Sequence, residues 1–212
     1  MARKTKEEAM ETRQSIIDAS VRVFARHGVA KTSLTDIARE AGVTRGAIYW
    51  HFANKADLLN SLWEHVQEFY APLTEASENV NEPDPLGKLQ ELYDSFFVAM
   101  EEDSLQQQLF RILFENGDRI KDTEVVRQRH QQLRLDRYNG LQVVLANAIR
   151  RGQIPQGFDV CLGTVIILAM IHGLIANWVM NPEFIDIKKH GPLVVESIFQ
   201  MFKSGIPAVQ ET

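Results

Sequence analysis

The chain has 212 residues, of which 45% are hydrophobic and 24% are charged, and its net charge is −5. This composition excludes an intrinsically disordered chain, and the length suits one large domain or a small and a medium one. The single cysteine, Cys161, excludes an intrachain disulfide, and the basic, polar N-terminus lacks the apolar core of a signal peptide. We therefore expect a cytoplasmic protein.

The charge is unevenly distributed along the chain. Residues 1–55 contain ten Lys or Arg against six Asp or Glu, a net charge of +4, whereas residues 56–212 have a net charge of −9. A basic first quarter favours binding to a polyanion, while the acidic remainder stays away from it.

Apolar residues recur at helical spacing throughout, and no alternating run is long enough for a strand, which predicts an all-α fold. The first helix is expected at residues 8–27, ended by Gly28. Capping residues Ser33, Thr44 and Asn54 predict the starts of three more helices, the last reaching the proline-rich stretch 79–85. Further helices are expected at residues 86–101, 104–116, 122–151, 159–180 and 187–203.

Residues 33–55 have the pattern of a helix-turn-helix. Ala38 is small enough for a close helix crossing, Gly42 suits the turn, and Ile48 fills the corner between the helices. A helical wheel places Thr44 and Phe52 on the core side with Ile48, and Gly46, Ala47, Tyr49 and Trp50 toward the opposite side. An exposed helical glycine costs about 1 kcal/mol against alanine, which is reasonable where another surface, such as a DNA major groove, approaches the backbone.

The side chains on this outer face predict contacts with DNA. Arg45 can reach a guanine edge, Tyr49 and His51 can donate to phosphates, and Lys55 lies at the N-terminus of the next helix, where a phosphate is favoured. The alternative is that the rings at 49–52 form the core of a small bundle. That alternative suits Phe52, and it stays open for Trp50.

The stretch from Glu11 to Leu59 resembles the N-terminal DNA-binding domain of the TetR family of bacterial repressors. VTRGAIYWHF at 43–52 and the opening MARKTKEEAMETRQ resemble in particular the AcrR-type repressors of multidrug efflux pumps within it. The resemblance implies that Thr32 or Ser33, Thr44, Tyr49, His51 and Lys55 touch phosphates and that Arg45 reads a base. The residues that fit the family pattern are Gly28, Thr32, Ser33, Leu34, Ile37, Ala38, Ala41, Gly42, Val43, Thr44, Gly46, Ile48, Tyr49, His51 and Phe52.

We accordingly divide the chain into a basic arm at 1–10, a helix-turn-helix domain at 11–55 and a helical domain for ligand binding and dimerisation at 56–212. The second domain is rich in aromatic residues, most of which are expected in the core, but such a bundle can also enclose a hydrophobic or cationic ligand. Glu115 would favour a cation, although it also suits a solvated helix end. The candidate ligand-binding residues are Trp63, Gln67, Tyr70, Phe97, Phe114, Glu115, Gln142 and Trp178.

Residues 160–180 contain no Lys, Arg, Asp or Glu and are long enough to span a membrane. Thr164, His172 and Asn177 interrupt the segment, and no basic asymmetry flanks it, so we favour a helix buried between two subunits. With the last helix it would form a twofold interface. The residues expected there are Gly163, Ile167, Met170, Gly173, Ile198 and Phe202.

The usual catalytic motifs, including G-x-S-x-G, the P-loop, H-E-x-x-H and Glu-x-x-His, do not occur, so we expect no enzyme, no cofactor and no metal. The sequence predicts a dimeric repressor, released from a palindromic operator in double-stranded DNA by a small hydrophobic or cationic inducer and without a membrane partner. The alternatives are a ligand-independent DNA-binding dimer, or a small-molecule-binding protein of the same fold with another regulon.

Overall fold

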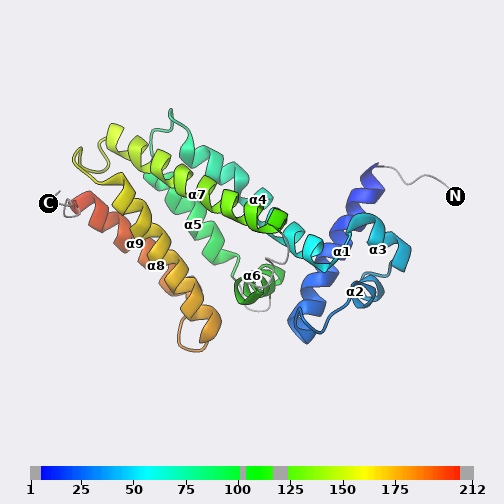
Figure 1. The fold of residues 1–212 in the computed structure, drawn as a ribbon. Helices are drawn as coiled ribbons and strands as arrows, with labels where there is room; N and C mark the ends of the chain where they lie inside the picture. Colours follow the sequence, from blue (N-terminus) through cyan, green and yellow to red (C-terminus); the bar gives the residue numbers. More distant parts are fainter. Residues whose placement is uncertain (1–5, 101–103, 117–123, 206–212) are drawn as a thin grey trace. The chain divides into compact units, whose positions relative to one another are not determined.

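The computed structural model describes residues 6–100, 104–116 and 124–205, and within these ranges every regular element is an α-helix, which confirms the all-α prediction. Figure 1 labels the helices in chain order. Their bounds are α1 Lys6–His27, α2 Leu34–Glu40, α3 Arg45–His51, α4 Lys55–Glu78, α5 Pro85–Val98, α6 Leu105–Asn116, α7 Glu124–Arg150, α8 Val160–Met180 and α9 Ile187–Ser204.

The ends of the short helices follow the local signals. Ser33 and Asp36 form a complete capping box at the start of α2, and the Thr44 side chain accepts a hydrogen bond from the Ala47 amide at the start of α3. Gly28 and Gly42 have φ angles of 76° and 67°, the left-handed conformation that glycine adopts without strain. These signals therefore place the turns on both sides of α2.

The chain forms two compact units, and their boundary differs from the division at residue 55. The first unit contains α1, α2, α3, α4 as far as Gln67, and also α6. Helix α1 begins at Lys6 and therefore includes residues 6–10 of the expected arm.

The core of the first unit combines residues that are distant in sequence. Side chains from α1, α2, α3 and α4 pack together, and three residues of α6 are buried in the same cluster. Packing of α6 against α1 supplies apolar area that the short helices α2 and α3 cannot provide by themselves. Members of this cluster include Ile16, Ile17, Phe24, Ile37, Ile48, Phe52, Leu58, Leu62, Leu109, Ile112 and Leu113.

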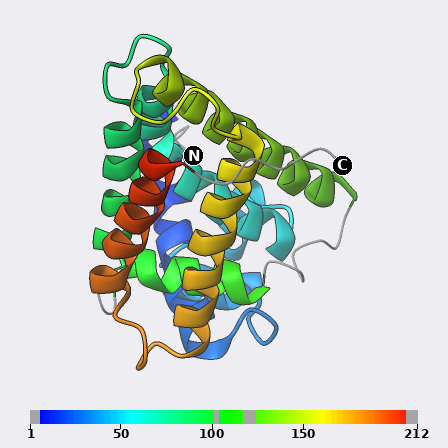
Figure 2. The same cartoon turned by 90° about the vertical axis from the view of Figure 1, so that its left-hand side faces the viewer.

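The second unit contains the rest of α4, α5, α7 from Arg127, α8 and α9. Helix α9 packs so closely on α5 that a Cβ atom at Gly191 would lie 2.4 Å from the Phe97 ring. The loop after α4 is tied to α7, since Asn147 donates hydrogen bonds to the carbonyls of Glu78 and Asn79, and Arg151 donates to that of Glu82. Figures 1 and 2 show α8 and α9 side by side.

Helix α8 buries one stripe of side chains and exposes another. Ile167, Ile171, Ile175 and Trp178 are buried, whereas Val165, Met170 and Met180 are exposed. Among the described residues, α8 is the one helix long and apolar enough to cross a membrane. An 18-residue stretch of it has a mean hydropathy of 2.1, and 28% of that stretch is buried. Part of this apolar helix thus stays exposed in the described structure.

Candidate nucleic-acid interface and ligand site

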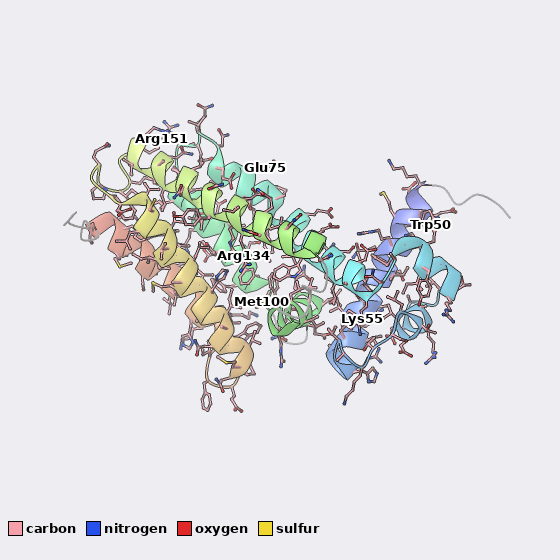
Figure 3. All side chains as sticks on the ribbon, in the orientation of Figure 1. Trp50, Lys55, Glu75, Met100, Arg134 and Arg151 are labelled. Atoms are coloured by element: carbon pink, nitrogen blue, oxygen red, sulfur yellow. The ribbon has the colours of Figure 1, made fainter. Side chains whose placement is uncertain are left out.

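Helix α3 has a buried side and an exposed side. Ile48 and Phe52 are 0% and 1% exposed and anchor the helix, whereas Tyr49 and Trp50 are 46% and 74% exposed. Trp50, labelled in Figure 3, therefore lies on the outer surface of α3 and is not core. Thr44 differs from the wheel prediction: it is exposed, because as the N-cap residue it precedes the first helical turn.

Gly46 lies in the first turn of α3 and is exposed. A Cβ atom built at this position would come no closer than 3.9 Å to any neighbouring atom, the nearest being Oγ1 of Thr44. The packing of the protein therefore does not require a glycine here. A surface outside the protein that approaches the backbone would require one.

Two ring contacts organise the exposed side of α3. The guanidinium carbon of Arg45 lies 5.6 Å from the centroid of the Tyr49 ring, and the rings of Trp50 and His51 meet edge to face with centroids 4.5 Å apart. These contacts restrict the rotamers of side chains that point to solvent. The base-reading and phosphate roles predicted for Arg45, Tyr49 and His51 stay predictions.

The two hydroxyls before α2 are placed differently. Ser33 is exposed, and its Oγ both accepts from the Asp36 amide and donates to the Asp36 carboxylate at 2.6 Å. The hydroxyl and, at 3.1 Å, the backbone amide of Ser33 both donate to this carboxylate, and they lower the pKa of Asp36 because they stabilise its ionised form. Thr32 is buried, and its hydroxyl donates to the Gly28 carbonyl, so it holds the loop together.

Lys55 has partners within the protein. Its ammonium nitrogen donates to the carbonyl oxygens of Val29, Ala30 and Thr32 at 2.7, 3.4 and 3.1 Å. An ammonium has three N–H donors, and these three acceptors can use all of them. Lys55, labelled in Figure 3, therefore joins the start of α4 to the loop between α1 and α2, and the phosphate contact predicted for it stays a prediction.

The eight candidate ligand residues are divided between the units. Trp63, Gln67, Phe114 and Glu115 belong to the first unit, and the side chains of Phe114 and Glu115 lie outside the described residues. Tyr70, Phe97, Gln142 and Trp178 belong to the second unit.

The described parts of these candidates are mostly packed. Burial raises the pKa of Tyr70 to about 12, Phe97 and Trp178 are buried, and Gln142 donates to the Cys161 thiol at 3.4 Å. Gln67 is exposed, and Trp63 packs against the core of the first unit. Hollows of about 560 and 400 Å³ lie over α1 and α2 and over α5 and α9, and none of the eight lines either. Ligand binding by these residues stays a prediction.

Four of the six expected interface residues pack inside the chain itself, and the interface predicted from them stays a prediction. Ile167, Ile198 and Phe202 are buried, and a Cβ atom at Gly163 would lie 2.5 Å from the Phe158 ring. Met170 is exposed, and a Cβ atom at Gly173 would have open space around it. The large apolar side chains that α8 and α9 leave exposed are Val165, Met170, Met180, Leu193 and Met201.

Some residues at this site were not predicted from the sequence. Arg13 donates to the Ser61 hydroxyl and lies over the Phe52 ring, and no local pattern indicates these contacts, because Ser61 is 48 residues away. A division at residue 55 places the three core residues of α6 in the second domain, whereas they pack in the core of the first unit. Their helical pattern was visible, but not the partner on which they pack.

Helices α2 and α3 form a capped helix-turn-helix, and α3 exposes the rings of Tyr49 and Trp50. This arrangement is typical of DNA-binding proteins of the helix-turn-helix class. Residues 16–62 match the model of the bacterial regulatory proteins of the tetR family, and residues 84–204 match the C-terminal region of MAATS-type transcriptional repressors. The chain therefore belongs to the tetR family and is a transcriptional regulator.

Relatives and solved structures extend this match over nearly the whole chain. The chain is 43% identical over 187 residues to the HTH-type transcriptional regulator TtgR of Pseudomonas putida, with 88% and 89% of the two chains covered. It is 35% identical to AcrR of Shigella flexneri, with 95% and 94% covered.

Among solved structures, a complex of SmeT with triclosan matches with a TM-score of 0.77 and 27% identity, covering 95% of this chain and 98% of that one. SmeT is the repressor of the Stenotrophomonas maltophilia multidrug efflux pump SmeDEF. NalD, the secondary repressor of the MexAB-OprM multidrug efflux pump in Pseudomonas aeruginosa, matches with a TM-score of 0.72 and 29% identity, covering 92% and 97%.

Proposed function

We propose that the protein is a dimeric, cytoplasmic repressor of multidrug efflux genes that a small hydrophobic or cationic compound releases from a palindromic operator. The observation that carries the DNA part is the exposed side of α3. Buried side chains anchor this helix, and its exposed side carries Arg45, Gly46, Tyr49 and Trp50. The efflux part rests on the relatives, since SmeT and NalD repress multidrug efflux pumps.

Arg45 is the side chain that we assign to base recognition. It is exposed in the first turn of α3, where a guanidinium can donate two hydrogen bonds to the O6 and N7 atoms of a guanine. Ser33, Thr44, Tyr49 and His51 then contact phosphates, and Trp50 supplies an apolar surface. Because one side chain reads few bases, half-site spacing and DNA shape provide the remaining specificity.

The uncovered apolar stripe of α8 supports a twofold dimer. Val165, Met170 and Met180 on α8, with Leu193 and Met201 on α9, would pack on the same residues of a second copy. A membrane is the other apolar environment for this stripe, but the buried side of α8 is built into the subunit core. A dimer places two reading helices about one turn of DNA apart, which requires a palindromic site.

Helix α4 connects ligand binding to DNA binding in this proposal. It begins at Lys55 in the first unit and continues beyond Gln67 into the second. Pro72 lies inside the helix and cannot donate a backbone hydrogen bond, so bending there costs less than elsewhere. A ligand that favours one arrangement of α4 needs a differential affinity of only about 1.4 kcal/mol to weaken operator binding tenfold.

The test begins with selection of binding sites from random DNA, and fluorescence anisotropy then gives the affinity for the selected site. We expect the selected site to be palindromic, and we expect sedimentation to show that a dimer binds it. Triclosan, as a neutral hydrophobic probe, and tetraphenylphosphonium, as a lipophilic cation, are then titrated, with melting temperature and operator release as the readouts. If neither compound shifts the melting temperature or releases the operator, the ligand-independent regulator is the better description.

A further inference from the structure

Arg13 joins its own helix to two other helices of the first unit. It lies on α1, and its guanidinium donates to Oγ of Ser61 at 2.9 Å and lies 3.8 Å from the carboxylate of Glu64, both on α4. The same guanidinium carbon is 5.3 Å from the centroid of the Phe52 ring, and Phe52 is the C-cap residue of α3. One side chain thus touches the end of the reading helix and the second and third turns of α4.

The partners of Arg13 are themselves held in place. Phe52 is buried, and its amide donates to the Ile48 carbonyl at 2.9 Å, so the ring moves with α3. Ser61 is buried, and its hydroxyl donates to the Asp57 carbonyl at 3.1 Å, which leaves its oxygen free to accept from Arg13. The planar guanidinium can stack on a ring while its edge donates hydrogen bonds, a combination that the point charge of a lysine does not provide.

Two other arginines of α1 differ from Arg13 in what they contact. Arg22 and Arg26 pair with the carboxylate of Glu40 on α2, at 3.3 and 2.6 Å. Among the described residues, neither forms a hydrogen bond, ion pair or ring contact with Phe52 or with α4. The side chains of Arg13 and Arg22 are about equally exposed, at 40% and 46%. Arg22 is therefore a matched reference for Arg13.

We propose that Arg13 is a positioning residue for operator recognition, which sets the angle of α3 against α4 by holding Phe52 and Ser61 together. The role rests on the proposed function, in which α3 reads the DNA. Because α4 continues into the second unit, a displacement of its first turns would reach α3 through this side chain. Arg13 then acts on specificity and does not itself contact DNA.

This role predicts a particular pattern of affinities. Binding to the selected operator requires α3 at the correct angle, whereas non-specific binding depends on phosphate contacts that tolerate small rotations. Arg13→Met keeps the side-chain stem but removes the guanidinium. It is expected to weaken operator binding on the order of tenfold, to leave binding to random DNA unchanged, and to leave the slope of affinity against salt unchanged.

The experiment measures both affinities at several salt concentrations for wild type, Arg13→Met, Arg22→Met and Ser61→Ala. Arg22→Met removes the same charge from the same helix and leaves Glu40 paired with Arg26, so its ratio of operator to random-DNA affinity should stay at the wild-type value. Ser61→Ala keeps the charge and the ring contact, and an intermediate fall of the ratio is expected even if Arg13→Met does not fold.

Three results would overturn the positioning role. A salt slope lowered by about one phosphate contact in Arg13→Met would make Arg13 a direct phosphate contact. An equal fall of both affinities with a lower melting temperature would leave Arg13 only a contribution to folding. Ratios equal to wild type in Arg13→Met and Ser61→Ala would show that α3 keeps its angle without Arg13. A wild-type protein that selects no site would instead contradict the proposed function.

Discussion

Arg45 and Tyr49 form a pair on the exposed side of α3, with the guanidinium carbon of Arg45 5.6 Å from the centroid of the Tyr49 ring. The two residues are four positions apart and therefore lie on neighbouring turns of one helix face. The ring restricts the rotamers of the arginine before DNA arrives, so less side-chain entropy is lost when the arginine binds a base.

Arg45→Ala is expected to weaken operator binding by about 1–3 kcal/mol and to relax the base preference at one position of each half-site. The reason is the loss of the paired hydrogen bonds to one base. Anisotropy titrations against operators substituted at each position measure the effect. Arg111→Ala, which removes an exposed arginine from α6, is the control. An unaltered base preference in Arg45→Ala would contradict the assignment.

Tyr49 combines a hydroxyl for a phosphate with a ring for Arg45, and two substitutions separate these functions. Tyr49→Phe keeps the ring and should weaken binding to all DNA sequences by the same factor. Tyr49→Leu removes the ring face, and it should in addition reduce the preference for the base that Arg45 reads. The same set of substituted operators provides the measurement. Identical base preferences in the two variants would show that the ring does not position Arg45.

Gly46→Ala is expected to change stability and DNA binding in opposite directions. The added Cβ fits, since its nearest neighbour would be 3.9 Å away, and alanine is favoured over glycine in a helix by about 0.5–1 kcal/mol. Thermal unfolding should therefore show a higher melting temperature. Operator affinity should fall, because the methyl group occupies the space that DNA needs. A variant that gains stability and keeps its affinity would exclude a close approach of DNA to this backbone.

Lys55→Met should destabilise the protein without changing the number of phosphate contacts. The substitution leaves the carbonyl oxygens of Val29 and Thr32 without the ammonium donor. A hydrogen bond to a charged group contributes up to about 1.5–3 kcal/mol to the free energy of unfolding. Urea unfolding measures the loss, and the slope of operator affinity against salt tests the contact. A slope reduced by about one would restore the phosphate role that the family resemblance implies.

Val165→Glu is expected to separate the dimer, because it places a carboxylate on the exposed stripe of α8. The matched control is Val80→Glu in the loop after α4, since the two valines are similarly exposed, at 51% and 57%. Sedimentation at micromolar concentration should find monomers for the first variant and dimers for the second. If Val165→Glu stays dimeric, the subunits pair through another surface.

The sequence alone was sufficient for the features that depend on neighbouring residues. The caps at Ser33 and Thr44 and the turn at Gly42 were predicted correctly, because each cap bond and each glycine conformation is decided within about four residues. The helical period placed Ile48 and Phe52 in the core for the same reason. The family pattern is built from these local signals, so the fold class and the helix-turn-helix could be predicted together.

Only the tertiary structure decided which distant partner each side chain meets. Trp50 is exposed although its ring alone suited a core, and Lys55 and Arg13 contact groups 23 to 51 residues away. In α8 nearly every side chain is apolar, so no polar face marks the side that meets solvent. Packing against the Phe158 ring determined that Gly163 lies on the buried side. Local propensities determined the helices of this protein, whereas the burial of distant apolar surfaces determined which helix faces stay exposed.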